Sequence, residues 1–178
     1  MNILHAIDRT RVTPEHFIAC IEIPAGCKNK YELDVETGAL MLDRVLYTST
    51  HYPQNYGFIP RTWSLDEDPL DVLVLTSESI VPMSLVRCYP IGILKMVDSG
   101  EVDEKILAIC ENDPFYNTFK SLEDVPPHIL EEITHFFQHY KELEHGKDTK
   151  IEGFFGKQEA ERAIAEARAR YDAKFPTR

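Results

Sequence analysis

SLDEDPLDVLVL, residues 64–75, places three aspartates directly before an uninterrupted apolar run. The run shows no alternation of polar and apolar residues, which predicts a strand that is covered on both faces. Pro69 fixes its own φ and pushes Asp68 toward an extended conformation, so the turn that aims the carboxylates is stiff. Like charges this close repel each other unless solvent or a cation compensates, and hard divalent cations such as Mg²⁺ prefer oxygen ligands. On spacing alone, the stretch indicates either a cation site at the mouth of a core strand or an acidic surface turn.

Composition and charge narrow the class of protein. The chain has 178 residues, of which 43% are hydrophobic and 28% charged, which predicts one domain over residues 1–178. A net charge of −11 disfavours nucleic acid and anionic membranes as partners, and no apolar run reaches membrane-spanning length. Four cysteines without CxxC spacing, and charged residues where a signal peptide needs its apolar core, predict a cytoplasmic protein.

The order of the expected elements predicts mainly β structure. Strands are expected at 17–24, 31–37, 39–49, 70–75, 85–96 and 105–111, with a proline-bounded loop at 51–60. A helical period then begins after the prolines at 126 and 127 and stops at Gly146, followed by a short strand at 150–155 and a helix at about 159–173. These elements predict a small antiparallel barrel with two helices packed outside it.

Several of these segments together resemble the soluble family I inorganic pyrophosphatases of the bacterial type. The resemblance covers roughly residues 20–155, and its most specific segment is the aspartate stretch. It is carried by IEIP (21–24), KYELD (30–34), GALMLDR (38–44), YPQNYGFIP (52–60), DEDPLDVLV (66–74), VRCYPIGILKMVD (86–98), DEK (103–105) and HFFQHYKELE (135–144). It implies an α+β, mainly β fold, namely a five-stranded OB-like closed β-barrel with two flanking α-helices.

The resemblance also implies a role for each matching site residue. Asp66, Asp71 and Asp103 would hold a first pair of Mg²⁺ ions, and Asp98 and Glu22 would help to hold further metals. Asp68 would be the base that takes the proton of the attacking water, which two cations share and convert to hydroxide. The phosphate-binding residues would be Lys30, Arg44, Tyr56, Lys105, Tyr140 and Lys141, with Glu32 and Tyr52 in support. The implied reaction is Mg²⁺-dependent hydrolysis of pyrophosphate to two phosphates, in an enzyme that is usually a homohexamer.

Several positions depart from the family pattern, among them Phe154, Asp148 and Thr149, and two lie close to the expected site. Glu67 stands where the family usually has a small residue such as Gly, Ser or Asn, and Ser99 follows Asp98 where many members carry an acid. Both changes lie beside predicted metal ligands, so they bear on how the site holds its cations.

Two other functions remain open at this point. The first is a related metallophosphohydrolase that acts on a nucleotide or another phosphoester. The second is a non-catalytic OB-like binding module, since such barrels often bind oligonucleotides or oligosaccharides. The acidic charge speaks against nucleic acid.

Overall fold

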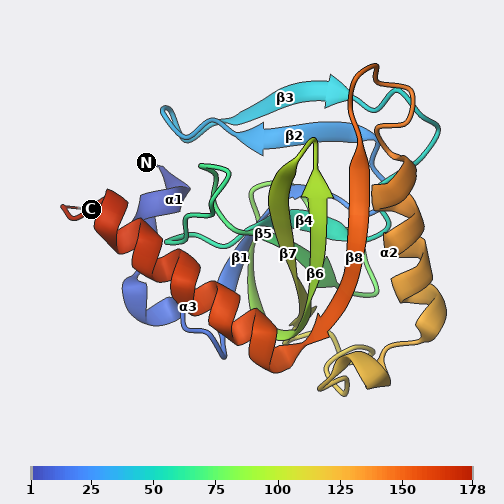
Figure 1. Ribbon diagram of the computed structural model, residues 1–178. Coiled ribbons are helices and arrows are strands. Elements are labelled where there is room, and N and C mark those ends of the chain that lie inside the picture. Colours follow the sequence, from blue (N-terminus) through green and yellow to red (C-terminus); the bar gives the residue numbers. More distant parts are fainter. Residues whose placement is uncertain (1, 178) are drawn as a thin grey trace.

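The computed structural model describes residues 2–177, which fold mainly into β-strands (Figure 1). The strands are β1 (Phe17–Ile23), β2 (Asn29–Leu33), β3 (Leu40–Val45), β4 (Asn55–Phe58), β5 (Asp71–Leu75), β6 (Leu85–Asp98), β7 (Glu101–Cys110) and β8 (Thr149–Gly156). The helices are α1 (Ile3–Ala6), α2 (Pro127–His139) and α3 (Lys157–Lys174), with 3₁₀ turns η1 (Arg9–Arg11) and η2 (Leu122–Asp124). The mainly β class is confirmed. The described residues contain more strands than the five that the resemblance implies for the barrel, because β8 joins the main sheet and β2 and β3 form a separate pair.

The strand pairings differ in one respect from the predicted antiparallel arrangement. Six strands pair in the order β1–β4–β5–β7–β6–β8, and β1 also pairs with β6, whereas β2 and β3 form a separate two-stranded sheet. β5 and β7 run parallel, while the other paired strands are antiparallel. The parallel pair arises because β6 lies between them in the chain, and the β6–β7 hairpin returns β7 alongside β5 in the same direction.

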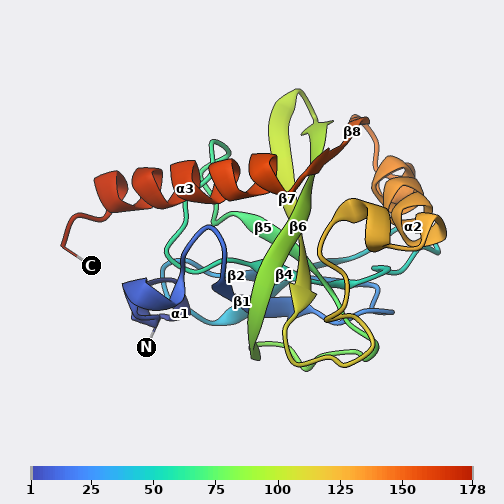
Figure 2. The same ribbon diagram turned by 90° about the horizontal axis from the view of Figure 1, so that it is seen from below.

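β5 is a central strand that is covered on both faces, as predicted. Its residues 72–75 are fully buried. Val72 and Val74 pack in the apolar cluster that contains the inward face of α3, whereas Leu73 and Leu75 pack in the cluster that contains α2. The two long helices lie on different sides of the sheet (Figures 1 and 2). This double cover explains why the apolar run does not alternate.

Two predictions about the secondary structure are wrong. The segment expected to be a loop at 51–60 contains β4, which pairs with both β1 and β5. The helix expected to continue to Gly146 ends at His139, and turns follow it. On β2, only Leu33 is buried, and Tyr31 is half-buried.

Ser99 and Gly100 form the hairpin turn between β6 and β7. Asp98 pairs with Glu101, and both turn residues have positive φ, 52° at Ser99 and 88° at Gly100. Such φ values fit the two-residue turns that match the twist of a hairpin. The turn places the end of β6 and the start of β7 side by side, and these strand ends carry Asp98 and Asp103.

Candidate active site

The register of three neighbouring strands brings the central charged groups together. Asp71 at the start of β5 is the parallel partner of Lys105 on β7. Asp103 lies two residues before Lys105 on the same face of that strand. Tyr56 on β4 donates its hydroxyl hydrogen to Asp71 Oδ2 at 2.5 Å. Residues far apart in the sequence therefore meet where these strands run together.

Lys105 is the buried cation at the centre of this group. Its ammonium donates to Tyr56 Oη at 2.9 Å, Asp71 Oδ2 at 2.8 Å and Asp103 Oδ1 at 2.9 Å, and the residue is only 2% exposed. Burial acts to lower the pKa of Lys105, but the charges of Asp103 and Asp71 outweigh it and raise the pKa well above its usual value. Lys105 is therefore charged at neutral pH and holds the two carboxylates together.

A polar cavity of about 210 Å³ opens over this group. It is lined by all the predicted site residues except Arg44, that is by Glu22, Lys30, Glu32, Tyr52, Tyr56, Asp66, Asp68, Asp71, Asp98, Asp103, Lys105, Tyr140 and Lys141. Seven carboxyl groups and three ammonium groups are among them. The cavity therefore carries excess negative charge when its groups are ionised.

Burial, together with the neighbouring negative charges, raises the pKa values of several of these carboxyl groups. Burial, followed by the charge of Asp71, raises the pKa of Glu22 to about 8 and that of Asp66 to about 6. Asp68 lies exposed at the rim, and partial desolvation together with Asp71 raises its pKa as well. For Asp103, burial raises the pKa although the charge of Lys105 opposes it. Each of these carboxylates would gain from a nearby cation.

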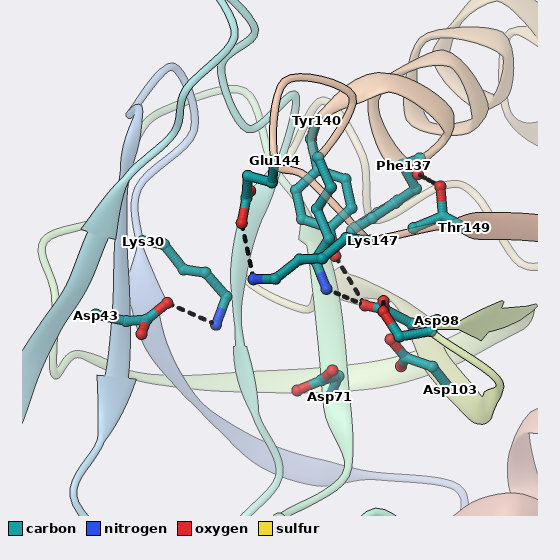
Figure 3. A network of polar contacts seen from close by, with 12 residues as sticks. Lys30, Asp43, Asp71, Asp98, Asp103, Phe137, Tyr140, Glu144, Lys147 and Thr149 are labelled. Carbon is teal, nitrogen blue, oxygen red and sulfur yellow. Dashed lines mark hydrogen bonds and ion pairs between the residues drawn. The ribbon is translucent and has the colours of Figure 1, made fainter.

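Asp98 is the exception, because it already has cationic and hydroxyl partners (Figure 3). Its Oδ2 contacts the ammonium of Lys141 and accepts a hydrogen bond from Tyr140 Oη at 3.2 Å. Burial alone would raise the pKa of Asp98, but these contacts and that of Ser99 lower it. Tyr140 and Lys141 follow the end of α2, so the early end of this helix lets the chain turn them toward β6.

A second basic cluster lies on the β2–β3 sheet. Lys30 lies opposite Arg44 in the strand register and contacts Glu32 and, at 3.5 Å, Asp43. Burial lowers the pKa of Lys30, although the charge of Asp43 opposes this effect. Figure 3 shows Lys30 pointing toward Asp43.

Arg44 is held beside the cavity and does not line it. Its Nε lies 3.1 Å from Glu144, a buried residue that also binds Lys147 (Figure 3), and its Nη1 lies 2.5 Å from Asp43. Nη2 of Arg44 is buried without a hydrogen-bond partner among residues 2–177. A buried guanidinium nitrogen without an acceptor is suited to an anionic ligand.

The sequence interpretation missed Asp43 and Glu144, which position the two basic side chains of the β2–β3 sheet. Both lie in segments that carry the family resemblance, GALMLDR and HFFQHYKELE, so their signal was present. Their partners could not be assigned, because the Arg44–Glu144 contact joins positions 100 residues apart.

The donor set fits divalent cations by charge and chemistry. Carboxylate oxygens are the ligands that Mg²⁺ and similar ions prefer, and here they outnumber the ammonium groups. Within residues 2–177, no three Asp, Glu, His or Cys side chains are already arranged around one ion position. Asp71 and Asp103 instead share Lys105, so Lys105 is the group with which an incoming cation would compete for their oxygens.

Known proteins with similar sequences show the family of this chain. The family model described as inorganic pyrophosphatase matches residues 19–172. The chain belongs to the inorganic pyrophosphatase family. Among inorganic pyrophosphatases, it is 48% identical to that of Caulobacter vibrioides over 91% of this chain and 93% of the relative. It is 46% identical to soluble inorganic pyrophosphatase 2 of Chlamydomonas reinhardtii over 92% and 85% of the two chains.

A solved member of the family has the same fold. The crystal structure of the inorganic pyrophosphatase from Thermus thermophilus superposes with a TM-score of 0.91 at 37% identity, covering 97% of this chain and 99% of that one. Among the described residues, no helix is long and apolar enough to cross a membrane. The family resemblance inferred from the motifs is therefore confirmed.

Proposed function

We propose that the cavity over β5 and β7 hydrolyses inorganic pyrophosphate to two phosphates with Mg²⁺ as cofactor. The observation that carries this proposal is the charge of the cavity, in which seven carboxyl groups face three ammonium groups in a member of the inorganic pyrophosphatase family. Such a cavity repels a polyanion by itself. The cavity can accept a polyanion only together with divalent cations, which pyrophosphate also binds.

Asp66, Asp71 and Asp103 are the groups that would hold the first cations, with Asp98 and Glu22 helping to hold others. Metal ions bound there would supply charge neutralisation of the substrate and would lower the pKa of a bound water. The support is electrostatic, because the pKa values of Asp66, Asp103 and Glu22 are raised, first by burial. Asp98 differs, since Lys141 already compensates its charge, and we assign it a secondary part in metal binding.

Asp68 is proposed as the base that accepts the proton of the attacking water. It lies exposed at the rim of the cavity, and its raised pKa makes it a better proton acceptor than an isolated aspartate. Its backbone N–H donates to Asp66 Oδ1 at 3.3 Å, which ties it to a proposed metal ligand.

The basic and hydroxyl groups are proposed to hold the phosphate oxygens. Lys30, Lys105 and Lys141 approach from different strands and turns, and Arg44 offers its unpaired Nη2 from β3. Tyr56 and Tyr140 present hydroxyl groups that already contact carboxylates of the site. Tyr52 packs on the ring of Tyr56 and Glu32 contacts Lys30, so both act in support.

Phosphate release from pyrophosphate by the purified protein tests this function. Activity should require Mg²⁺, and Asp68→Asn should reduce kcat by at least about 100-fold. Asp172→Asn makes the same chemical change on the exposed side of α3 and should leave kcat unchanged. Full activity in Asp68→Asn would remove Asp68 as the base.

Turnover of other substrates separates the remaining alternatives. A metallophosphohydrolase of another class would turn over ATP or a phosphomonoester at least as fast as pyrophosphate. A non-catalytic binding module would bind Mg²⁺ in calorimetry without releasing phosphate from any of the three compounds. Pyrophosphate turnover far above that of both other compounds is the result that we expect.

We also propose that the protein is a homohexamer of the cytoplasm and that its central strands form a closed OB-like barrel. The pairing of β1 with both β4 and β6 supports the barrel, because it links β1, β4, β5, β7 and β6 in a ring. Light scattering on the purified protein tests the hexamer, and a monomeric mass would contradict it.

A further inference from the structure

Cys88 and Cys110 face each other across β6 and β7, at the end of the strand pair away from the cavity. They are direct partners in the antiparallel register. One step further along the pair, the N–H of Glu111 donates to the carbonyl oxygen of Arg87 at 3.0 Å. Hydrogen-bonded and non-hydrogen-bonded residue pairs alternate along an antiparallel ladder. Cys88 and Cys110 therefore form a non-hydrogen-bonded pair, the type in which opposed side chains are closest.

This position satisfies the geometric needs of a disulfide. In a non-hydrogen-bonded pair the Cα atoms lie about 4.5 Å apart, within the range of about 4.4–6.8 Å that disulfides bridge. Cys88 belongs to the apolar cluster that α3 helps to form, and Cys110 packs against the same cluster, so both side chains lie on one side of the sheet. Both cysteines are free thiols in this structure.

The two thiols differ in exposure, which suggests an order of reaction. Cys110 is half-buried, whereas Cys88 is fully buried and its thiol lies 3.7 Å from the carbonyl oxygen of Val86. Burial raises the pKa of Cys88 well above its usual value, and Cys110 raises it further. Cys110 is therefore the thiol that meets an oxidant, and Cys88 is placed to react with it next.

We propose that Cys88 and Cys110 are a redox modification site that closes to a reversible cross-strand disulfide on reaction with hydrogen peroxide. The Cys110 thiolate attacks one peroxide oxygen; an S–O bond forms, the O–O bond breaks, and hydroxide leaves and is protonated to water. The Cys88 sulfur then attacks the sulfur of the Cys110 sulfenic acid. The S–S bond forms as the S–O bond breaks, and the leaving hydroxyl takes up the Cys88 proton as a second water. Two thiols lose two electrons, and peroxide is reduced to two waters.

The link would join the two strands that carry Asp98, Asp103 and Lys105, but at a distance from these residues. Cys110 lies five residues beyond Lys105 on β7, which is about 17 Å at the rise of an extended strand. The disulfide should therefore leave turnover of pyrophosphate unchanged. Because it closes a loop of about 22 residues in the unfolded chain, it should raise Tm by about 6–12 °C.

Peptide mapping tests the link directly. Trypsin places Cys88 in the peptide 88–95, Cys110 in the peptide 106–120, and both Cys20 and Cys27 in the peptide 12–28. After mild peroxide treatment, the whole protein should lose the mass of two hydrogen atoms, and 88–95 should be found linked to 106–120. Dithiothreitol should restore both the mass and the separate peptides.

Matched variants separate this pair from the other cysteines. Cys110→Ala should abolish the mass loss and the rise in Tm, whereas Cys27→Ala, which removes another half-buried thiol, should leave both in place. A link that involves the peptide 12–28, or oxygen added to Cys110 without a link to Cys88, would overturn the proposal. Since mapping uses the unaltered chain, this result does not depend on how the variants fold.

Discussion

Replacing Lys105 by methionine removes the buried cation that holds Asp71 and Asp103 together. Methionine is a flexible apolar side chain of comparable length and can fill the space between Tyr56 and Phe137, whose rings lie 5.2 Å from the ammonium. Removing one partner of a buried ion pair costs about 3–5 kcal/mol, because the remaining charge is left uncompensated. Here two carboxylates lose their partner, although part of their charge faces the cavity. We expect the free energy of unfolding to fall by about 3 kcal/mol.

Urea unfolding in Mg²⁺-free buffer measures this loss, with the fluorescence of Trp63, the single tryptophan, as the signal. On heating, the same loss lowers Tm by about 6–12 °C for a chain of this size. Lys95→Met is the matched control. Lys95 also lies between two carboxylates, Glu104 at 3.7 Å and Glu159 at 3.2 Å, but its side chain is 27% exposed. That substitution should cost less than about 1 kcal/mol.

Added Mg²⁺ makes the test specific for the proposed competition at Asp71 and Asp103. In Lys105→Met the two carboxylates have no competing ammonium, so saturating Mg²⁺ should recover more stability in this variant than in the unaltered protein. Phosphate release should still fall, because Lys105 is also proposed to hold a phosphate oxygen. Equal losses in the Lys105 and Lys95 variants, or equal Mg²⁺ effects in the Lys105 variant and the unaltered protein, would refute this account of the site.

Three further changes test other parts of the site. The pKa of Glu22 is about 8 in the folded protein against an ordinary 4.5, so the folded protein binds this proton more tightly than the unfolded chain. In EDTA, Tm should therefore fall as the pH rises from about 4.5 to 8. A Glu22→Gln variant whose Tm depends on pH with the same slope would contradict this. Arg44→Lys keeps the positive charge but removes the unpaired Nη2, so KM for pyrophosphate should rise about 10-fold while Tm stays nearly constant. An unchanged KM would exclude Arg44 from substrate binding. Glu67→Asn should add about 0.5–1 kcal/mol to the free energy of unfolding measured in urea, because Glu67 has a φ of 65° that asparagine adopts more easily. Its exposed ion pair with Lys174 contributes little to stability. A less stable variant would show that this backbone is not strained.

The left-handed backbone at Glu67 fits the small residue, such as Gly, Ser or Asn, that the family resemblance implied at this position. Gly and Asn adopt positive φ at little cost. Ser99, the second departure, has φ of 52° in the hairpin turn. Glu67 and Ser99 therefore both have left-handed backbone conformations. Neither residue type favours this conformation, so the sequence of this chain alone did not predict it.

β5 was predictable because its sequence and its environment agree, whereas β4 was not. The short strand at 55–58 lies between a proline and a tight turn, and its residues Asn55 and Gly57 are poor strand formers. Its pairing with β1 and β5 overrides these propensities. Gly57 is required because a Cβ there would lie 1.9 Å from the carbonyl oxygen of Cys20. Such a close approach between strands is set by tertiary structure and leaves no periodic signal.

The candidate site likewise contains some contacts that the sequence could predict and others that it could not. Asp66, Asp68 and Asp71 are close in sequence and on one strand end, so their meeting follows from local structure. The contact of Lys141 with Asp98 depends on where α2 ends, and the apolar pattern of the helix predicted that end several residues too late. The residue types of the site were therefore predictable from the motifs, whereas its internal ion pairs required the fold.

These ion pairs imply that cations and substrate bind interdependently. Lys105 and Lys141 are engaged by Asp71, Asp103 and Asp98, which makes them less available to a phosphate. On the proposed function, a divalent ion bound by one of these carboxylates would free an ammonium group for a phosphate, and a phosphate bound by the ammonium group would free a carboxylate for the ion. Because such coupling between two ligands is reciprocal, Mg²⁺ should raise the affinity for a pyrophosphate analogue by the same factor as the analogue raises the affinity for Mg²⁺. On the proposed function, the acidic cavity would therefore select its anion through the cations that accompany it.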